Sequence, residues 1–110
     1  MHDDVEYPSP DAESCSSGTG SALLHLGVRD QTGAAIPGAS IYVVPVAGPP
    51  SRASVTSAVT DARGFADLQV PGNEAYVVTV VFVGFMPEAR ALYLRQGCSA
   101  THALILRVVG

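Results

Sequence analysis

Two copies of the pattern Asp-x-x-Gly constrain the fold of this 110-residue chain more than any other feature. One occupies residues 30–33 (Asp-Gln-Thr-Gly) and the other occupies residues 61–64 (Asp-Ala-Arg-Gly). In a tight turn, an aspartate at the first position caps the backbone, and a glycine at the fourth position suits the conformation that closes the turn. Each segment is therefore predicted to form strand, turn and strand rather than helix.

Short apolar segments between turn signals predict the rest of the architecture. The expected strands are residues 22–28, 39–44, 55–60, 65–70, 75–83, 89–95 and 102–109. None of them has helical periodicity, and the prolines in residues 46–54 predict a loop there because proline lacks the donor that a strand ladder needs. We therefore expect an all-β fold, a seven-stranded antiparallel Greek-key β-sandwich of the immunoglobulin-like or prealbumin-like kind, over residues 21–110.

Residues 1–20 differ in composition from the rest of the chain. They are rich in Asp, Glu, Ser, Pro and Gly, so we expect a disordered acidic tail. The net charge of −4 arises largely from this tail, and the remaining body is nearly neutral. With no basic patch, nucleic acid is not an expected partner, and the apolar runs are too short for membrane insertion. No signal peptide is visible, which fits either a cytoplasmic chain or one whose signal peptide has been removed.

The two cysteines, Cys15 and Cys98, predict a single disulfide. An even count at widely separated positions in a small domain is typical of an oxidising compartment. The alternative is two unrelated thiols. A metal site using both would need further ligands, and no motif supplies them, so we expect neither a metal nor a cofactor.

The predicted strand over residues 75–83 is apolar on both faces. One face would carry Tyr76, Val78, Val80 and Phe82, and the other would carry Val77, Thr79, Val81 and Val83. A strand that faces water on one side normally alternates apolar with polar residues. We therefore expect the outer face to be covered, either within the fold or by a partner. The partner could be another protein or a second copy, associating through an apolar sheet face or edge.

The order of these motifs resembles a known family. Val-Arg-Asp-x-x-Gly-x-x-Ile-Pro-Gly-Ala-x-Ile begins at Val28, Thr-Asp-x-x-Gly-Phe begins at Thr60, and Tyr-x-Val-x-Val at Tyr76 leads to Gly-Phe at Gly84. Together they resemble the carboxypeptidase regulatory-like family, a prealbumin-like sandwich, over residues 21–109. The resemblance implies that Gly64 relieves a turn, Tyr76 packs under the sandwich and Phe85 plugs the core.

The same resemblance implies a function. Such domains are accessory modules of secreted, periplasmic or cell-envelope proteins, usually bacterial and usually not catalytic. We therefore expect a structural or protein-docking module, with no catalytic residues. A remote alternative is a small transthyretin-related hydrolase, but those enzymes end in Tyr-Arg-Gly-Ser, whereas this chain ends in Leu-Arg-Val-Val-Gly.

Residues able to carry chemistry are few. His25 and His102 lie on the first and last predicted strands and could approach each other if those strands pair, although a third metal ligand is lacking. Asp61 and Asp67 could suggest calcium, yet Asp61 is more simply a turn cap, and no loop holds the alternating carboxylates that calcium requires.

Tyrosines offer a second kind of candidate site. Tyr42 and Tyr93, with Tyr7, could form an aromatic platform for carbohydrate or peptide, together with the loops at residues 46–54 and 84–88. The alternative is that these tyrosines only pack against neighbours or lie at the rim of a contact.

Overall fold

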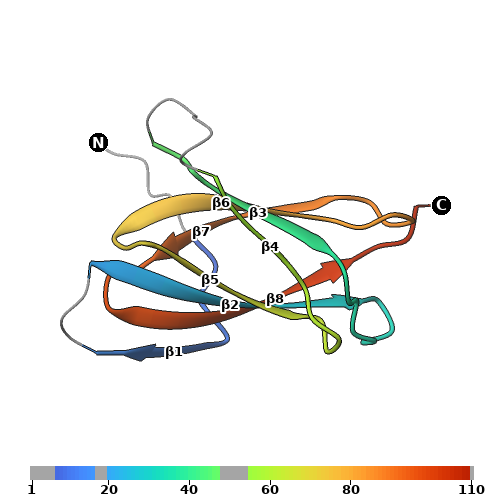
Figure 1. The fold of residues 1–110 in the computed structure, drawn as a ribbon, viewed down its shortest axis with the longest axis horizontal. Coiled ribbons are helices and arrows are strands. Elements are labelled where there is room, and N and C mark those ends of the chain that lie inside the picture. The colour runs from blue at the N-terminus through green and yellow to red at the C-terminus, as the bar shows by residue number, and fades with distance from the viewer. Residues whose placement is uncertain (1–6, 17–19, 48–54, 110) are drawn as a thin grey trace.

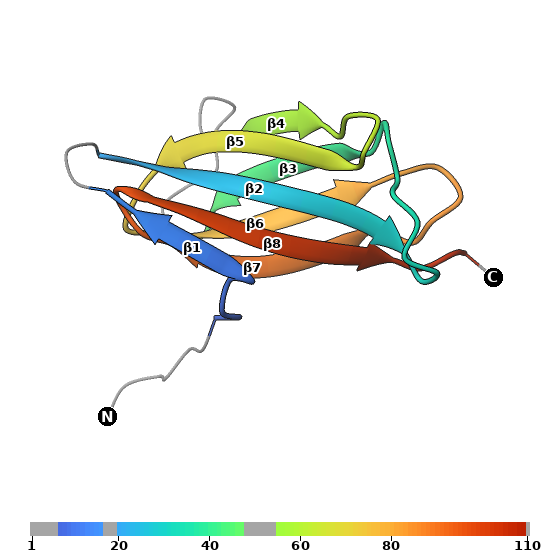
Figure 2. The same ribbon diagram turned by 90° about the horizontal axis from the view of Figure 1, so that it is seen from below.

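The computed structural model describes residues 7–16, 20–47 and 55–109, which form two four-stranded sheets packed face to face (Figures 1 and 2). The first sheet has the order β1 (Ala12–Cys15), β8 (Cys98–Leu106), β2 (Ser21–Asp30) and β5 (Phe65–Pro71). The second has the order β4 (Thr56–Val59), β3 (Ser40–Pro45), β6 (Glu74–Val81) and β7 (Glu88–Leu94). The described part of the chain contains no helix of the length and hydropathy needed to cross a bilayer.

The path of the chain confirms the predicted all-β sandwich. Two antiparallel hairpins, β3–β4 and β6–β7, lie within the second sheet, and the other connections from β2 onward cross between the sheets. Two details of the prediction are wrong. The structure has eight strands rather than seven, and β2 pairs with β8 in parallel rather than antiparallel.

The additional strand, β1, lies in the segment predicted to be a disordered tail. All four of its residues are exposed, and it pairs with β8 alone. The prediction was wrong for residues 12–15 because it considered only how much apolar surface the segment could bury. Strand β1 is instead held by backbone hydrogen bonds to β8 and by the bond between Cys15 and Cys98. Strand β8 begins at Cys98, earlier than predicted, because its first residues pair with β1. Residues 1–6 and 17–19 of the predicted tail lie outside the described residues.

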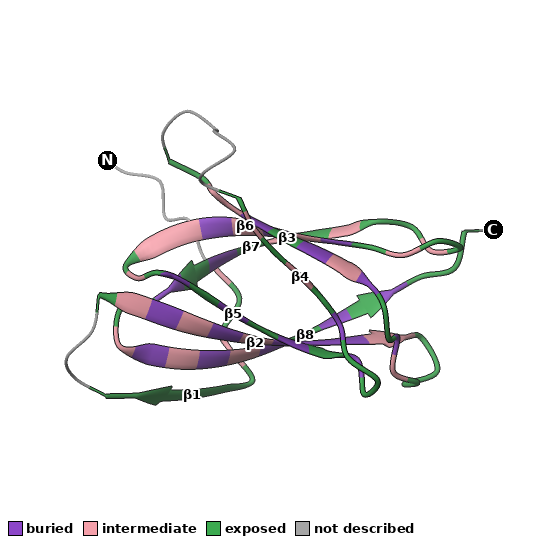
Figure 3. Ribbon diagram, viewed as in Figure 1, coloured by how far each residue is buried: buried purple, intermediate pink, exposed green. Residues whose placement is uncertain are grey.

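The core lies between the sheets, where alternate residues of the strands other than β1 point inward (Figure 3). Its largest fully buried side chains are Tyr76, Leu24, Leu26, Ile41, Leu92, Leu94, Leu104, Leu106, Val28, Val43, Val78 and Val80. Burying each such side chain contributes about 1.5–3 kcal/mol before the entropy of ordering is subtracted. Tyr76 packs in this core, as expected, and Phe85 is partly buried against it.

Tyr76 also carries a polar contact at the core's margin. Its hydroxyl donates a hydrogen bond to the carbonyl oxygen of Pro71. Burial, reinforced by the Glu74 carboxylate, raises the pKa of Tyr76 to about 12. The phenol therefore stays neutral across the physiological range and can donate to Pro71.

Both Asp-x-x-Gly segments form the capped turns that the sequence predicted. Asp30 Oδ1 accepts hydrogen bonds from the Thr32 hydroxyl and from the amides of Thr32 and Ala34. Asp61 Oδ1 accepts from the amides of Arg63 and Phe65. These donors stabilise the charged carboxylates and lower the pKa of both aspartates.

The buried Thr60, which begins the Thr-Asp-x-x-Gly-Phe motif, forms hydrogen bonds to the Ile-Pro-Gly-Ala segment of the first motif. The sequence pattern did not predict this role. The Thr60 hydroxyl donates to the Ile36 carbonyl at 2.7 Å and accepts from the Ala39 amide at 2.8 Å. It thus bridges the two ends of the Ile-Pro-Gly-Ala segment, where Gly38 adopts φ 81°.

Candidate functional site

The two domain histidines do not share a site, although their strands are neighbours. In the parallel β2–β8 ladder His102 is opposite Leu26, and His25 is opposite Thr101. Because neighbouring residues of a strand point to opposite faces, His102 points into the sandwich and His25 points away from it. His102 is 3% exposed. The expectation that the two rings could approach each other is therefore wrong, and a hydrolase or metal site built on both has no geometric basis.

His25 instead pairs with Asp67 on the outer face of the first sheet. Asp67 accepts a hydrogen bond from His25 Nδ1, and Thr101 occupies the next strand in the same row. A groove of about 380 Å³ lies beside the histidine, lined by Ala12, Glu13, Ser14, His25, Ser99 and Thr101. Nucleophilic catalysis also needs donors for an oxyanion, and β2 is paired on both sides, so its amides are used in ladders. This pair is best described as a hydrogen bond between two side chains on the protein surface.

Potential metal ligands gather at one place in the described residues. Glu13, Cys15 and Cys98 offer ligand atoms within 4.8 Å of one another. Both cysteines are engaged in a disulfide, however, and a thiolate rather than a disulfide sulfur is the ligand that metals take. Asp61 is occupied as a turn cap and Asp67 by His25, so the structure does not bring them together as a calcium site.

The outer face of the second sheet has an unusual composition. The register of its strands fixes which residues point away from the core. From β3 and β4 these are Ser40, Tyr42, Val44, Ser57 and Val59. From β6 and β7 they are Ala75, Val77, Thr79, Val81, Ala89, Ala91 and Tyr93. None of them carries a charge, and we call this surface the uncharged face.

The outer face of the first sheet is different. It carries the His25–Asp67 pair, the Gln69 side chain donating to Ser21, and the Arg29 guanidinium over the Phe65 ring. Such a mixture of charged and polar groups is typical of a solvated sheet face. The uncharged face lacks these groups. Its composition is therefore unusual for a sheet face exposed to water.

Strand β6 explains the double-sided apolar pattern seen in the sequence. It is central in the second sheet, with Tyr76, Val78 and Val80 buried against the core. Val77 and Thr79 on its other side are only partly exposed, because the neighbouring strands flank them. No described element covers that side. One side of strand β6 is therefore buried in the core. The residues on its other side lie at the centre of the uncharged face.

Tyr42 and Tyr93 both belong to the uncharged face and lie well apart on it. They are exposed by 43% and 44%, and their register partners on β6 are Thr79 and Ala75. The two tyrosines lie on strands at either side of β6, and their partners on β6 are four residues apart. Their Cα atoms are therefore about 17 Å apart. Tyr7 packs on Tyr93 alone, with ring centroids 6.1 Å apart. Of the two loops proposed to join such a site, residues 48–54 lie outside the described residues.

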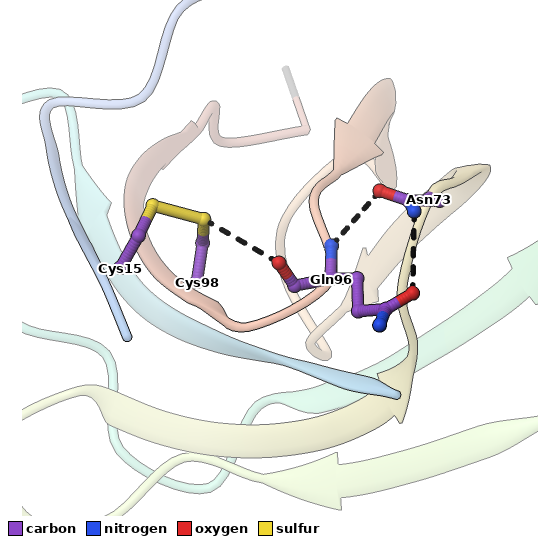
Figure 4. The surroundings of a disulfide bond; sticks show 4 residues. All are labelled: Cys15, Asn73, Gln96 and Cys98. Atoms are coloured by element: carbon purple, nitrogen blue, oxygen red, sulfur yellow. Dashed lines mark hydrogen bonds between the residues drawn. A yellow bond between two sulfur atoms is a disulfide. The ribbon is translucent and has the colours of Figure 1, made fainter. Parts of the chain in front are cut away.

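The disulfide joins the N-terminal strand to the sandwich (Figure 4). Cys15 and Cys98 are direct partners in the β1–β8 ladder and are bonded through sulfur, as the sequence predicted. Next to them, Gln96 and Asn73 share two hydrogen bonds: the Gln96 amide donates to Asn73 Oδ1 at 3.1 Å, and Gln96 Oε1 accepts from Asn73 Nδ2 at 3.3 Å. The disulfide thus lies beside the point where the turn containing Asn73 and the turn containing Gln96 are hydrogen-bonded to each other.

Comparison with known proteins agrees with this architecture. The family model described as carboxypeptidase regulatory-like domain matches residues 24–107. The chain belongs to this family. No curated protein sequence matches it.

Solved structures share the fold of this carboxypeptidase regulatory-like domain at low sequence identity. The Bacillus anthracis TIE protein is 19% identical with a TM-score of 0.65, over 81% of this chain and 17% of that one. The group B streptococcus pilus 2b backbone protein is 12% identical with a TM-score of 0.63, over 78% and 40%. The 3-chlorocatechol 1,2-dioxygenase from Rhodococcus opacus is 13% identical with a TM-score of 0.68, over 94% and 64%. The chain spans less than two thirds of each, so these likenesses show the fold alone.

His102 gives the carboxypeptidase regulatory-like domain a pH-dependent stability. Burial lowers the pKa of His102, the carboxylates of Asp11 and Glu13 act in the opposite direction, and Arg90 adds to the lowering. The unfolded chain therefore binds a proton at a higher pH than the folded one, and stability falls as the pH drops below about 6.5. We expect His102→Gln to remove this fall and the outward-facing His25→Gln to keep it. Urea unfolding at neutral and mildly acidic pH measures both, and an unchanged fall in His102→Gln would contradict the assignment.

Proposed function

We propose that this chain is a non-catalytic module of an extracytoplasmic protein, and that it docks another protein surface through the uncharged face. The observation that carries the proposal is the composition of that face, where four adjacent strands place no charge outward. Apolar sheet surfaces of this kind are typical of interfaces rather than of solvated faces. The disulfide supports the extracytoplasmic location, because such bonds persist in oxidising compartments.

The rest of the described surface supports a binding role rather than a chemical one. The histidines are on opposite faces, the cysteines are bonded to each other, and the capping aspartates are engaged in turns. The rigid sandwich behind the uncharged face keeps that face preformed, which reduces the entropy lost on docking. Tyr42 and Tyr93 then serve as aromatic contacts toward the two sides of one interface, not as a sugar platform.

Site-specific photocrosslinking in the cells that make the protein tests the docking role. A benzoylphenylalanine at Ala91 lies on the uncharged face, and one at Ala103 lies on the outer face of the first sheet; both alanines are exposed. We expect protein adducts from Ala91 and not from Ala103. Absence of adducts from Ala91, or equal yields from both positions, would overturn the proposal. Glycan binding by the purified chain that is lost in Tyr42→Ala would replace it with carbohydrate recognition.

A further inference from the structure

We infer that the partner of the uncharged face is a second copy of this chain, packed face to face through the same surface. This inference rests on the docking role proposed above and specifies its occupant. Figure 2 shows the second sheet, β4, β3, β6 and β7, as one layer behind the first. At the edge strand β7, Tyr7 contacts Tyr93. A groove beside these two rings is also lined by Pro8, Ser9, Pro10, Glu13 and Arg95.

Charge favours an identical partner. The chain has a net charge of −4, so two copies repel weakly at long range, but the surfaces that would meet carry no charge. A charged partner would lose hydration on this face without gaining any ion pair. The uncharged face offers valine, alanine, threonine and tyrosine side chains, and a second uncharged face offers the same. An interface of one patch with itself is the arrangement found in two-fold symmetric dimers.

Shape also favours an identical partner. Two sheets pack well when their twists match, with strands within about 30° of each other, and two copies of one sheet have the same twist. The uncharged face therefore needs no reshaping to receive its own copy.

The area of the face is sufficient for a reversible dimer. The strands β4, β3, β6 and β7 have 4, 6, 8 and 7 residues. At about 3.4 Å for each residue and about 4.8 Å for each strand, they give a face of about 400 Å². Two copies would bury about 800 Å², which is less than a standard specific interface and lies in the range of weak, transient complexes. We therefore expect a weak, concentration-dependent dimer rather than an obligate one.

Sedimentation of the purified full chain tests the inference with a matched pair of variants. Thr79→Lys places a charge at the centre of the uncharged face, on the central strand β6. Thr101→Lys places the same charge at the centre of the other outer face, on β8, where the threonine is also partly exposed. Near a two-fold axis, the ammonium introduced by Thr79→Lys in one copy would meet its counterpart in the other, so one substitution acts twice.

From roughly 5 µM to 500 µM we expect the wild type and Thr101→Lys to pass from monomer to dimer. Thr79→Lys should weaken association by about tenfold or more, because a charge buried at the contact has no partner. Circular dichroism and thermal unfolding of both variants show whether each is folded, and Val77→Ser provides an uncharged second variant with the same expected direction. A wild type that stays monomeric, or equal weakening by Thr79→Lys and Thr101→Lys, would overturn the inference.

The two proposals can fail separately. If the purified chain stays monomeric while Ala91 crosslinks to a different protein in cells, the docking role stands and the second copy is wrong. If Ala91 gives no adduct and Thr79→Lys does not change dimerisation, the chain dimerises elsewhere, for example through strand edges. The docking role and the second copy are then both wrong. An adduct at Ala91 with twice the mass of this chain, together with dimerisation lost in Thr79→Lys, supports both.

Discussion

Replacing Gly64 with alanine is expected to destabilise the domain by about 3 kcal/mol or more. Gly64 has φ +83°, which an alanine adopts at a cost of about 1 kcal/mol. A Cβ there would also lie 2.7 Å from the carbonyl oxygen of Val28. That oxygen accepts a hydrogen bond from the Ile36 amide at 3.0 Å, and the Val28 amide donates to the Gly64 carbonyl at 2.8 Å. The added methyl must displace backbone that is fixed by both bonds.

Gly33→Ala is the matched control for this prediction. Gly33 closes the other Asp-x-x-Gly turn with φ +90°, but a Cβ at this position would meet nothing within 4 Å. Only the conformational cost remains, so we expect a loss of about 1 kcal/mol. Urea unfolding of the two variants separates backbone strain from close packing, and equal losses would show that the contact with Val28 relaxes freely.

The difference between these two glycines shows what the sequence could predict and what it could not. The turns and the strands around them follow from local chemistry, because aspartate caps and glycine closes wherever the pattern occurs. The packing of one turn against Val28 and Ile36 depends on which strands become neighbours. The contact of Thr60 also depends on the tertiary fold. Its hydroxyl bonds to a residue 24 positions away in the sequence, and a local sequence pattern cannot predict such a contact.

The candidate site was predicted in part. The two apolar faces of residues 75–83 indicated an interface, and register places Val77 and Thr79 at the centre of the uncharged face. The sequence could not show that β3, β4 and β7 also present uncharged residues on the same side, because this requires the pairing of all four strands. The expectation about the histidines was wrong for the same reason. The sequence analysis considered pairing of the first and last strands only as a condition, and it could not predict the register that puts His25 and His102 on opposite faces.

Removal of the disulfide tests how the N-terminal strand is held. Cys15 and Cys98 are 83 residues apart, so the bond encloses nearly the whole sandwich in one covalent loop. In the chain-entropy model, closing a loop of this length stabilises the fold by about 4 kcal/mol through restriction of the unfolded chain. Part of that loss can be offset, since β1 has only exposed side chains and can detach from β8 without opening the core.

For the double variant Cys15→Ser/Cys98→Ser we therefore expect a loss of about 3 kcal/mol and a Tm lower by about 15 °C. The remaining sandwich should stay folded, because the strands that supply its core do not depend on β1. Hydrogen exchange should become fast at residues 12–15 and stay slow at Val78 and Val80, which are fully buried on the central strand β6. If exchange instead rises throughout the second sheet, β1 and its cystine are required for the whole fold, and the sandwich is not the independent unit that its core indicates.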